Sequence, residues 1–264
     1  MANYLTQNNH PAHRLFYTWS GWPSEESASP VFSAEPDEAF FAELSGLWKD
    51  DGLTLLSRTW KSDLIQLAFA VTPAIAPTFF AQRAKGRLQH ALRKVGQSTD
   101  FSRKVSVRAI GENITPVVKS YLAQQTERGD FADNRYRATL AAEAFENESL
   151  SLAEPTEVRR GRYWYNLHLV MVTAGRFRMG REDFALKLRA AAHETAIQQC
   201  CALKSFALMP DHVHLALRGN VDLAPVEIGV AFQNGLGRAA GCRLWNDRFY
   251  VGTFSEYALS RILP

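Results

Sequence analysis

Two histidines separated by one residue, His212 and His214, are the first candidates for chemistry in this sequence. They lie in residues 209–215 (MPDHVHL), inside an apolar run over 205–217 that we expect to form a single strand. Because side chains alternate along a strand, the two imidazoles would share one face. Adjacent imidazoles can bind a divalent metal and leave coordination positions open for a substrate. A bare pair of this kind is more often two hydrogen-bonded sheet histidines, so the other residues have to separate the two interpretations.

The composition is that of an ordinary soluble globular protein. The 264 residues are 46% hydrophobic and 22% charged, and this length fits one large domain or two smaller ones. Three cysteines, an odd number without C-x-x-C spacing, argue against a disulfide framework and a zinc knuckle. No apolar run approaches the roughly 20 residues of a membrane span, and residues 1–13 lack the apolar core of a signal peptide. We therefore expect a cytoplasmic protein without membrane association.

The expected elements come in a similar order in both parts of the chain. The first part should form a strand over 13–20, a helix from 36, strands over 53–60 and 63–71, a helix over 77–94, a strand over 104–110 and a helix from 115. The second should form a strand over 163–173, a helix over 183–201, the histidine strand over 205–217, a helix from 225 and a strand over 249–254. This order predicts an α+β fold of two ferredoxin-like (RRM-like) domains with antiparallel sheets.

Short matches at a near-constant spacing indicate an internal duplication. Residues 63–68 (DLIQLA) match 211–216 (DHVHLA) at an offset of 148, and residues 107–112 match 251–256 at an offset of 144. An Ala-Pro pair at 76–77 recurs at 224–225, again at an offset of 148. We infer two copies of one fold, divided into a disordered lead over 1–12, a first domain over 13–126, a charge-rich connector over 127–162 and a second domain over 163–264.

The histidine stretch, with its Met-Pro-Asp lead-in and the Leu-Ala-Leu that begins at residue 215, resembles the HUH motif of single-strand DNA transposases that use one catalytic tyrosine. Residues 104–113 (KVSVRAIGEN) and 115–125 (TPVVKSYLAQQ) look like the strand, turn and tyrosine helix of the same insertion-sequence family. The resemblance implies that Tyr121 is the nucleophile and that Gln125, one helical turn later on the same face, is a metal ligand. Without it, a tyrosine beside Val118 and Leu122 would more often be part of a core.

Each half lacks what the other has. Leu64 and Gln66 occupy the histidine positions of the first half, and the second half ends before a tyrosine helix. In the family that the motif resembles, the histidines of one subunit of a dimer work with the tyrosine of the other. We therefore expect a tandem pseudo-dimer in which one composite site joins Tyr121 and Gln125 of the first half to His212 and His214 of the second. His168, on the first strand of the second half, is interpreted as a sheet histidine rather than a third ligand.

The resemblance implies metal-dependent nicking of single-stranded DNA and strand transfer through a 5′-phosphotyrosine intermediate. A metal on His212, His214 and Gln125, Mg²⁺ or Mn²⁺, would neutralise charge at the scissile phosphate. Two alternatives stay open: a non-catalytic single-stranded DNA-binding protein derived from such a transposase, and an unrelated H-x-H phosphohydrolase. The second would need a further histidine or acid nearby, and residues 215–217 (LAL) offer none.

The expected partner is single-stranded DNA with hairpin ends, which would place the protein at the nucleoid. The net charge of +3 permits a polyanion without requiring one, but residues 81–108 hold eight Lys or Arg and one acid. A solvated helix face is the plainer interpretation. We expect DNA contacts from Arg83, Lys85, Arg87, Arg93, Lys94, Arg103 and Lys104. The chain should act as a monomeric pseudo-dimer that can self-associate further.

Overall fold

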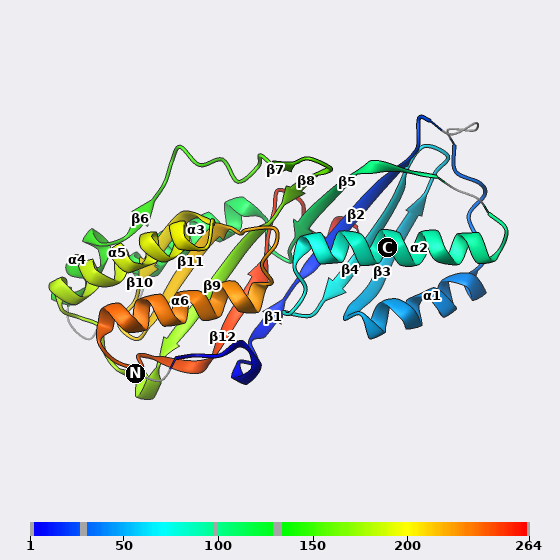
Figure 1. Cartoon of the computed structure of the whole chain (residues 1–264). Helices are drawn as coiled ribbons and strands as arrows, with labels where there is room; N and C mark the ends of the chain where they lie inside the picture. Colours follow the sequence, from blue (N-terminus) through cyan, green and yellow to red (C-terminus); the bar gives the residue numbers. More distant parts are fainter. Residues whose placement is uncertain (1–2, 27–30, 98–99, 129–133, 263–264) are drawn as a thin grey trace.

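The computed structural model describes residues 3–26, 31–97, 100–128 and 134–262, apart from a few side chains between 123 and 136. It is an α+β structure with two six-stranded, mostly antiparallel sheets placed side by side (Figure 1). This confirms the predicted class of two ferredoxin-like units. Within the described residues, no helix is long and apolar enough to cross a membrane.

The N-terminal sheet has the strand order β3-β4-β2-β5-β8-β7. Its strands are β2 (Phe16–Pro23), β3 (Leu53–Trp60), β4 (Ile65–Val71), β5 (Phe101–Ile110), β7 (Thr156–Val158) and β8 (Gly161–Trp164). One face is covered by α1 (Glu38–Asp50), which Asp37 caps by accepting a hydrogen bond from the Phe40 backbone N–H, and by α2 (Pro77–Lys94). The other face of this sheet, opposite the buried Tyr17 and Trp19, carries Thr18, Ser20, Gln66, Ser106 and Arg108 and is named here the open face.

The C-terminal sheet has the order β1-β12-β9-β11-β10-β6. Its strands are β1 (Ala12–Arg14), β6 (Phe145–Glu146), β9 (Asn166–Thr173), β10 (Ala202–Leu208), β11 (His212–Arg218) and β12 (Trp245–Thr253). The helices α5 (Glu182–Gln198) and α6 (Pro225–Ala240) pack against each other on one face. The helix α3 (Thr115–Arg128) lies against β10, next to α4 (Asn134–Ala142). Short 3-10 turns complete the fold at Thr6–Asn8, Ala174–Arg176 and Leu259–Arg261.

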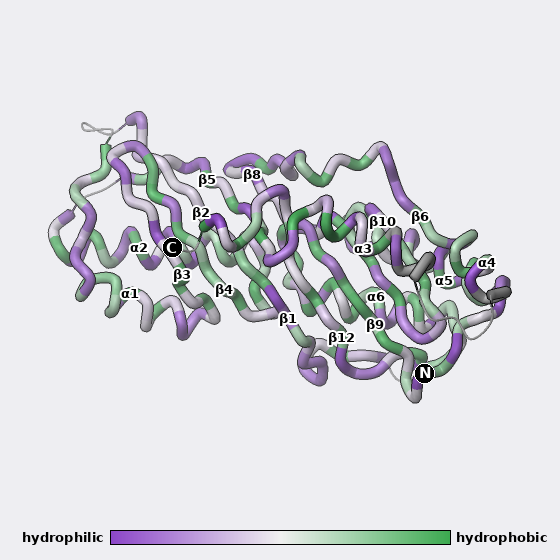
Figure 2. Tube along the Cα trace, turned by 180° about the vertical axis from the view of Figure 1, so that it is seen from behind, coloured by the Kyte–Doolittle hydropathy of each residue, from purple (hydrophilic) through white to green (hydrophobic). Residues whose placement is uncertain are grey.

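The chain crosses from one sheet to the other twice. β1 pairs in parallel with β12 of the C-terminal sheet, and the chain then continues directly into β2 of the N-terminal sheet. In the same way β8 pairs in parallel with β5, and the chain continues into β9. The hydrophobic core is accordingly continuous across both sheets, and Figure 2 shows hydrophobic residues gathered along the central strands.

Matching registers relate the two sheets. Tyr17 pairs with Ala109, and Leu167 pairs with Thr253, which is the residue 144 positions after Ala109. Two isolated parallel bridges obey the same offset, because Gly111 pairs with Ala258 and Ile114 pairs with Ser255. Each bridge is therefore the counterpart of the other, as in an approximate twofold arrangement.

Three segments differ from or add to the sequence expectations. The run over 205–217 is not one strand: β10 and β11 form a hairpin, whose turn is closed by the Met209 N–H donating to the His212 carbonyl at 2.8 Å. Pro210 lacks an N–H and is disfavoured inside a central strand, which explains the break. In the predicted disordered lead, Tyr4 is buried and its hydroxyl accepts from the Trp245 N–H at 2.7 Å. The predicted connector supplies α4, β6, β7 and the start of β8. The domain boundaries themselves stay a prediction.

Thr253 is expected to be the most sensitive hydrogen-bonding residue between the two sheets. Its hydroxyl accepts from the Phe16 N–H at 2.9 Å and donates to the Ile110 carbonyl at 2.5 Å, and the side chain is buried. Thr253→Val keeps the shape but leaves the Phe16 N–H without a partner. We expect it to lower the free energy of unfolding by about 1–3 kcal/mol in urea denaturation. Thr253→Ser keeps the hydroxyl and should lose less; equal losses in both variants would contradict this role.

Candidate functional site

The helix α3 begins in the first half of the chain and lies on the sheet of the second half. The Thr115 N–H donates to the Ser255 carbonyl at 2.8 Å, next to the bridge between Ile114 and Ser255. Further along, Val118 and Leu122 are buried in a small cluster with Leu152, Ala216 and Phe254. These contacts fix the helix and leave the side chain of Tyr121, between the two anchoring residues, 46% exposed.

β11 brings both histidines beneath this helix. It is a central strand, and its alternate residues Val213 and Leu215 are fully buried in the core, so His212 and His214 point to the opposite face. The ring centroids of His212 and His214 are 4.9 Å apart, and that of Tyr121 is 5.4 Å from that of His214. The structure therefore brings three of the predicted site residues together. The side chain of Gln125, the fourth, lies outside the described residues.

Asp211 holds His212 in one orientation. His212 Nδ1 lies 2.7 Å from Asp211 Oδ1, and since a carboxylate only accepts, the imidazole donates through Nδ1. Arg176 donates to the other carboxylate oxygen at 2.7 Å. Partial burial would raise the pKa of Asp211, but the hydrogen bonds from His212 and Arg176 outweigh it and the pKa is lowered. Asp211 thus stays ionised, and its hydrogen bond occupies Nδ1 of His212 and leaves Nε2 for a further partner.

His168 does the same for His214. Its Nε2 lies 3.1 Å from Nδ1 of His214, and the two rings are stacked at 16°. Burial lowers the pKa of His214 to about 2, helped by the neighbouring His168 and His212, and burial lowers that of His168 to about 4. Both rings are therefore neutral. If Nδ1 of His214 donates to His168, its Nε2 carries the lone pair, and this buried atom has no hydrogen-bond partner.

Two imidazoles that are each held through Nδ1 and leave Nε2 for a ligand suit a divalent cation. In proteins the second nitrogen of a ligating histidine is usually held by a carboxylate, a carbonyl or another polar group, as Asp211 and His168 hold these two. Over the described part of the chain, no group of three or more His, Cys, Asp or Glu side chains could hold a metal ion. A complete site would therefore need ligands of another type, and the predicted Gln125 stays a prediction.

The corresponding face of the N-terminal sheet has no imidazole pair. Leu64 and Gln66 stand at the equivalent positions, and the Gln66 amide donates to the Ser20 hydroxyl at 3.3 Å. His168 likewise corresponds to Thr18, at the offset of 150 that relates β2 to β9. Among the described residues, an imidazole pair on a sheet face is therefore present in the second half and not in the first.

The seven basic residues predicted to contact DNA fall into two groups. Three make contacts within the fold: Arg87 donates twice to Asp51 at 2.8 and 3.0 Å, Arg83 lies 3.9 Å from the same carboxylate, and Lys85 donates to the Ser102 carbonyl at 2.7 Å. The remaining four are exposed: Arg93, Lys94, Arg103 and Lys104. Contact of any of these side chains with DNA stays a prediction.

Sequence reasoning missed how His168 and Arg176 support the site. His168 was interpreted as a sheet histidine, which its hydrogen bond to His214 agrees with, but its contact with a ligand candidate was not foreseen. The signal is in the strand pairing: Ala216 pairs with His168, so His168 is diagonal to His214 on the same face. That register requires knowing that β9 and β11 are neighbours. Arg176 comes from a 3-10 turn that no periodicity predicts.

Stability should fall below pH 6.5 because of the buried histidines. The pKa of His168 is about 4 in the fold against 6.5 ordinarily, so in this range the unfolded chain binds a proton that the folded chain does not. The stability is fully present above pH 6.5 and is lost as the pH falls, by about 2 kcal/mol at pH 5 for one such histidine. In urea denaturation with chelator, the free energy of unfolding of His168→Gln should fall less between pH 7 and pH 5 than that of the wild-type protein, by about that amount. The exposed His10→Gln serves as control, and equal pH dependence in both variants would contradict the assignment.

Comparison with known proteins finds a family match for the second half of the chain. Residues 162–263 match the family model described as "Transposase IS200 like", a range that contains His168, His212 and His214 but not Tyr121. No curated protein matches the chain. Among solved structures, the ligand-free regulatory subunit of aspartate kinase from Thermus thermophilus aligns over 85% of this chain and 92% of that one. Its identity of 9% and TM-score of 0.21 are too low to support any conclusion. Over residues 162–263 the chain is thus similar to the IS200-like transposases, which indicates an enzyme of DNA processing in transposition and recombination.

Proposed function

We propose that this protein nicks single-stranded DNA and transfers the strand through a 5′-phosphotyrosine intermediate at one composite site. Tyr121 of the first half would be the nucleophile, and His212 and His214 of the second half would hold the metal. The observation that carries the proposal is the approach of the Tyr121 ring to the His214 ring, 5.4 Å between centroids, by residues 93 positions apart. The similarity of residues 162–263 to IS200-like transposases supports it independently.

The chain's own residues define the covalent step. Oη of Tyr121 loses its proton and attacks the phosphorus of the scissile phosphate. The bond between Oη and phosphorus forms, the bond from phosphorus to O3′ breaks, and the released O3′ takes up a proton. The 46% exposure of Tyr121 leaves room for a DNA strand to reach it. The phosphotyrosine conserves the energy of the broken bond, so a second 3′-hydroxyl can later displace the tyrosine and rejoin the strand.

The two histidines would bind Mg²⁺ or Mn²⁺ through Nε2, with Gln125 as the proposed further ligand. When bound, the metal would supply positive charge to the nonbridging oxygens of the scissile phosphate. Imidazole is tolerated better by Mn²⁺ than by Mg²⁺. Asp211 and His168 are then positioning residues, because they hold the ligands and not the substrate.

The matching registers and the twofold-like bridges support a fused pseudo-dimer with one site per chain. A chain with one site cuts one strand at a time, so the mobilisation of an element with two ends, with their proposed hairpins, would require a second molecule. A non-catalytic single-stranded DNA-binding protein is the alternative, and covalent capture separates the two.

Covalent capture on single-stranded DNA tests the proposal directly. Incubation with labelled oligonucleotides, both unstructured and hairpin-forming, and Mn²⁺ should yield a denaturation-resistant adduct that mass spectrometry maps to Tyr121. Tyr121→Phe removes the nucleophile and should abolish the adduct, and His214→Ala should reduce it at least 100-fold, of the order expected for loss of charge stabilisation. Tyr257→Phe, at a tyrosine of similar exposure, is the control. DNA binding with no adduct on any substrate would favour the non-catalytic alternative.

Removal of the carboxylate behind His212 should weaken metal binding without unfolding the protein. Asp211→Ala leaves Nδ1 of His212 without its acceptor, and losses of this kind typically reduce metal affinity about 10–100-fold. Titration of Mn²⁺ followed by electron paramagnetic resonance measures this affinity. Asp183→Ala, which removes an exposed acid on α5, should leave it unchanged. Equal Mn²⁺ affinity in wild type and Asp211→Ala would argue against a metal on His212.

A further inference from the structure

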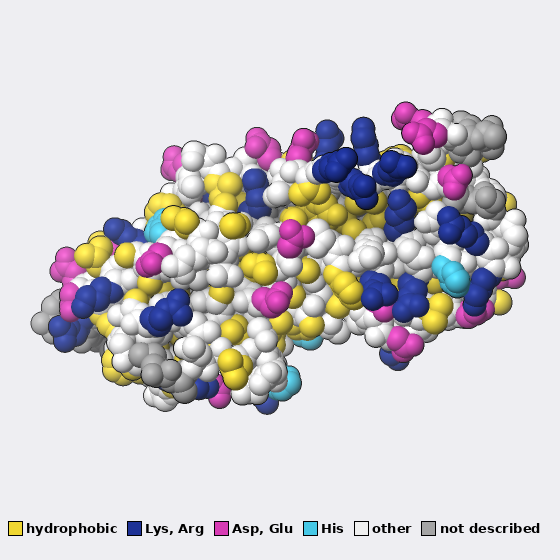
Figure 3. Space-filling view, in the orientation of Figure 1, with side chains coloured by type: hydrophobic (Ala, Val, Ile, Leu, Met, Phe, Trp, Pro, Cys, Tyr) yellow, Lys and Arg dark blue, Asp and Glu magenta, His cyan; other side chains and the backbone are white. Residues whose placement is uncertain are grey.

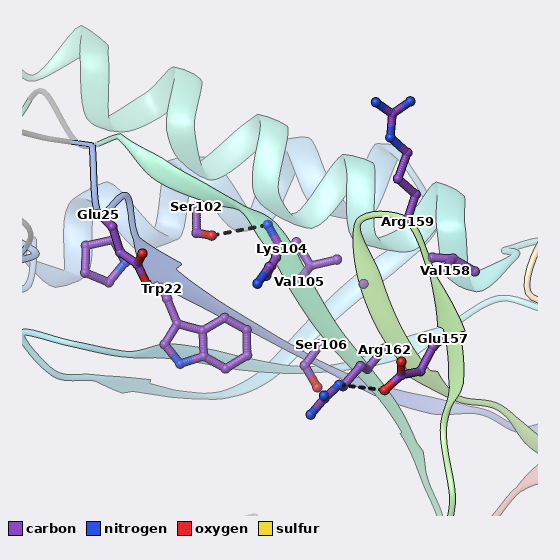
Figure 4. A pocket seen from close by; sticks show the side chains of 12 residues that line it. Trp22, Glu25, Ser102, Lys104, Val105, Ser106, Glu157, Val158, Arg159 and Arg162 are labelled. Carbon is purple, nitrogen blue, oxygen red and sulfur yellow. Dashed lines mark hydrogen bonds and ion pairs between the residues drawn. The ribbon is translucent and has the colours of Figure 1, made fainter.

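A groove of about 530 Å³ lies on the N-terminal sheet, away from the histidines. Figure 4 shows Trp22 on one side of β5 and the hairpin of β7 and β8 on the other, with side chains of β5 between them. The groove is lined by Trp22, Pro23, Glu25, Ser102, Lys104, Val105, Ser106, Glu157, Val158, Arg159, Gly161 and Arg162. Its two walls come from segments far apart in sequence, joined by the parallel pairing of β5 with β8.

Positive charge predominates around this groove. Figure 3, which views the molecule from the side of α1 and α2, shows Lys and Arg side chains gathered over an apolar patch where β5, β7 and β8 lie, so positive charge also flanks this edge of the sheet from the helix side. Lys104, Arg159 and Arg162 line it against two acids, Glu25 and Glu157. Glu157 pairs with Arg162 at 3.1 Å, but both side chains are about two-thirds exposed, so this ion pair is weak. Arg103 and Arg160 are also exposed but do not line the groove, and Arg103 points to the face opposite Lys104 because side chains alternate along β5. The lining therefore holds three cations against two acids.

Trp22 is the unusual member of the groove. The six tryptophans of the chain all fall within the described residues, and Trp22 is 38% exposed while the others are buried or half-buried. It belongs to the open face, because Trp19, three residues earlier on the same strand, points into the core, and residues an odd number of positions apart point to opposite faces. An exposed indole beside lysine and arginine side chains, across a shallow groove, combines a surface for stacking a base with charges for a phosphate backbone.

We propose that this groove binds single-stranded DNA, with Trp22 stacked on a base and Lys104, Arg159 and Arg162 on phosphates. Single strands suit it better than a duplex, because only an unpaired base exposes its face to an indole. The groove is also on the same side of the fold as the histidines. Side chains alternate without interruption from β8 into β9, because Tyr163, Tyr165 and Leu167 are all buried. Arg162 and His168 therefore share the opposite face. Six residues of strand place them roughly 20 Å apart.

The binding role does not depend on catalysis; only its use in holding a strand for cleavage rests on the proposed function. The segment around Ala153 passes between the two places, since the Trp164 indole donates to the Ala153 carbonyl at 2.7 Å. The groove is therefore a second contact for the strand and not an extension of the metal site. A strand held at both places would span a few nucleotides between them.

Fluorescence anisotropy with a labelled oligothymidylate of about 15 nucleotides, a length within the range covered by one small binding domain, tests the proposal. Trp22→Ala should raise Kd about 10-fold, from the loss of one stacked base, and Trp22→Phe should recover most of the affinity. Lys104→Glu should raise Kd at least as much and flatten the salt dependence. Lys49→Glu, on an exposed lysine of α1 at the opposite face of the same sheet, is the matched control. Circular dichroism verifies that each variant folds.

Photocrosslinking supplies a second readout. An oligothymidylate with 5-iodouracil substitutions should crosslink to Trp22, and mass spectrometry locates the attachment. Unchanged Kd in Trp22→Ala and Lys104→Glu, or crosslinks only outside the groove, would overturn the proposal. The test is separate from that of catalysis: His214→Ala should lose the covalent adduct and keep the crosslink to Trp22. In the wild-type protein, a crosslink without the covalent adduct would therefore count against the proposed reaction, and the adduct without the crosslink would count against the groove.

Discussion

The exchange of strands between the two sheets is the constraint on which the rest of the structure depends. β1 and β8 each pair with the sheet of the other half, and the buried Thr253 hydroxyl of the C-terminal sheet bonds the Phe16 N–H and the Ile110 carbonyl of the N-terminal sheet. Because the halves are locked in this way, the chain leaving β5 can only continue across the junction, through the bridge at Ile114, onto the second sheet. Tyr121 reaches the histidines as a consequence of this topology. A rigid junction also suits the proposed site, whose nucleophile and metal ligands would come from different halves.

Burial sets the chemistry at the histidines. A protonated imidazole cannot bind a metal, and the desolvation that lowers the pKa of His214 to about 2 keeps it neutral through the physiological range. The same burial would be costly for an isolated polar ring, and the hydrogen bond between the rings of His214 and His168 offsets part of that cost. What remains is one unpaired buried atom, Nε2 of His214. Several other buried polar side-chain atoms of the described residues also lack a partner, and this one differs from them in its place beside a second imidazole, where a cation would bond to it.

Local patterns in the sequence predicted most elements, including the strand of the two histidines and the helix of Tyr121, because alternation and helical periodicity are properties of short segments. The pairing of Tyr121 with His212 and His214 was predicted from the resemblance and the complementary halves. Features set by long-range pairing were missed. The break at Pro210 was visible in the sequence, but the apolar run outweighed it. The contact of His168 with His214 depends on the neighbourhood of β9 and β11, and the packing of Tyr4 against Trp245 joins residues 241 positions apart.

The two sheets also differ in where they tolerate positively charged side chains. Arginine and lysine can gather only on the sheet face that lacks the histidines. Arg108 of β5 pairs with Thr18, and its guanidinium lies 3.8 Å over the Trp164 ring. At the offset of 144, its counterpart is Gly252, which pairs with His168. An arginine there would place a fixed positive charge beside the imidazoles and repel a bound metal, and even a Cβ would meet the Tyr250 hydroxyl at 2.5 Å. The face without a metal pair has no such restriction, so positive charge can accumulate along β5 and β8. On our two proposals, the metal would thus bind to one sheet and the basic groove would lie on the other sheet of the same chain.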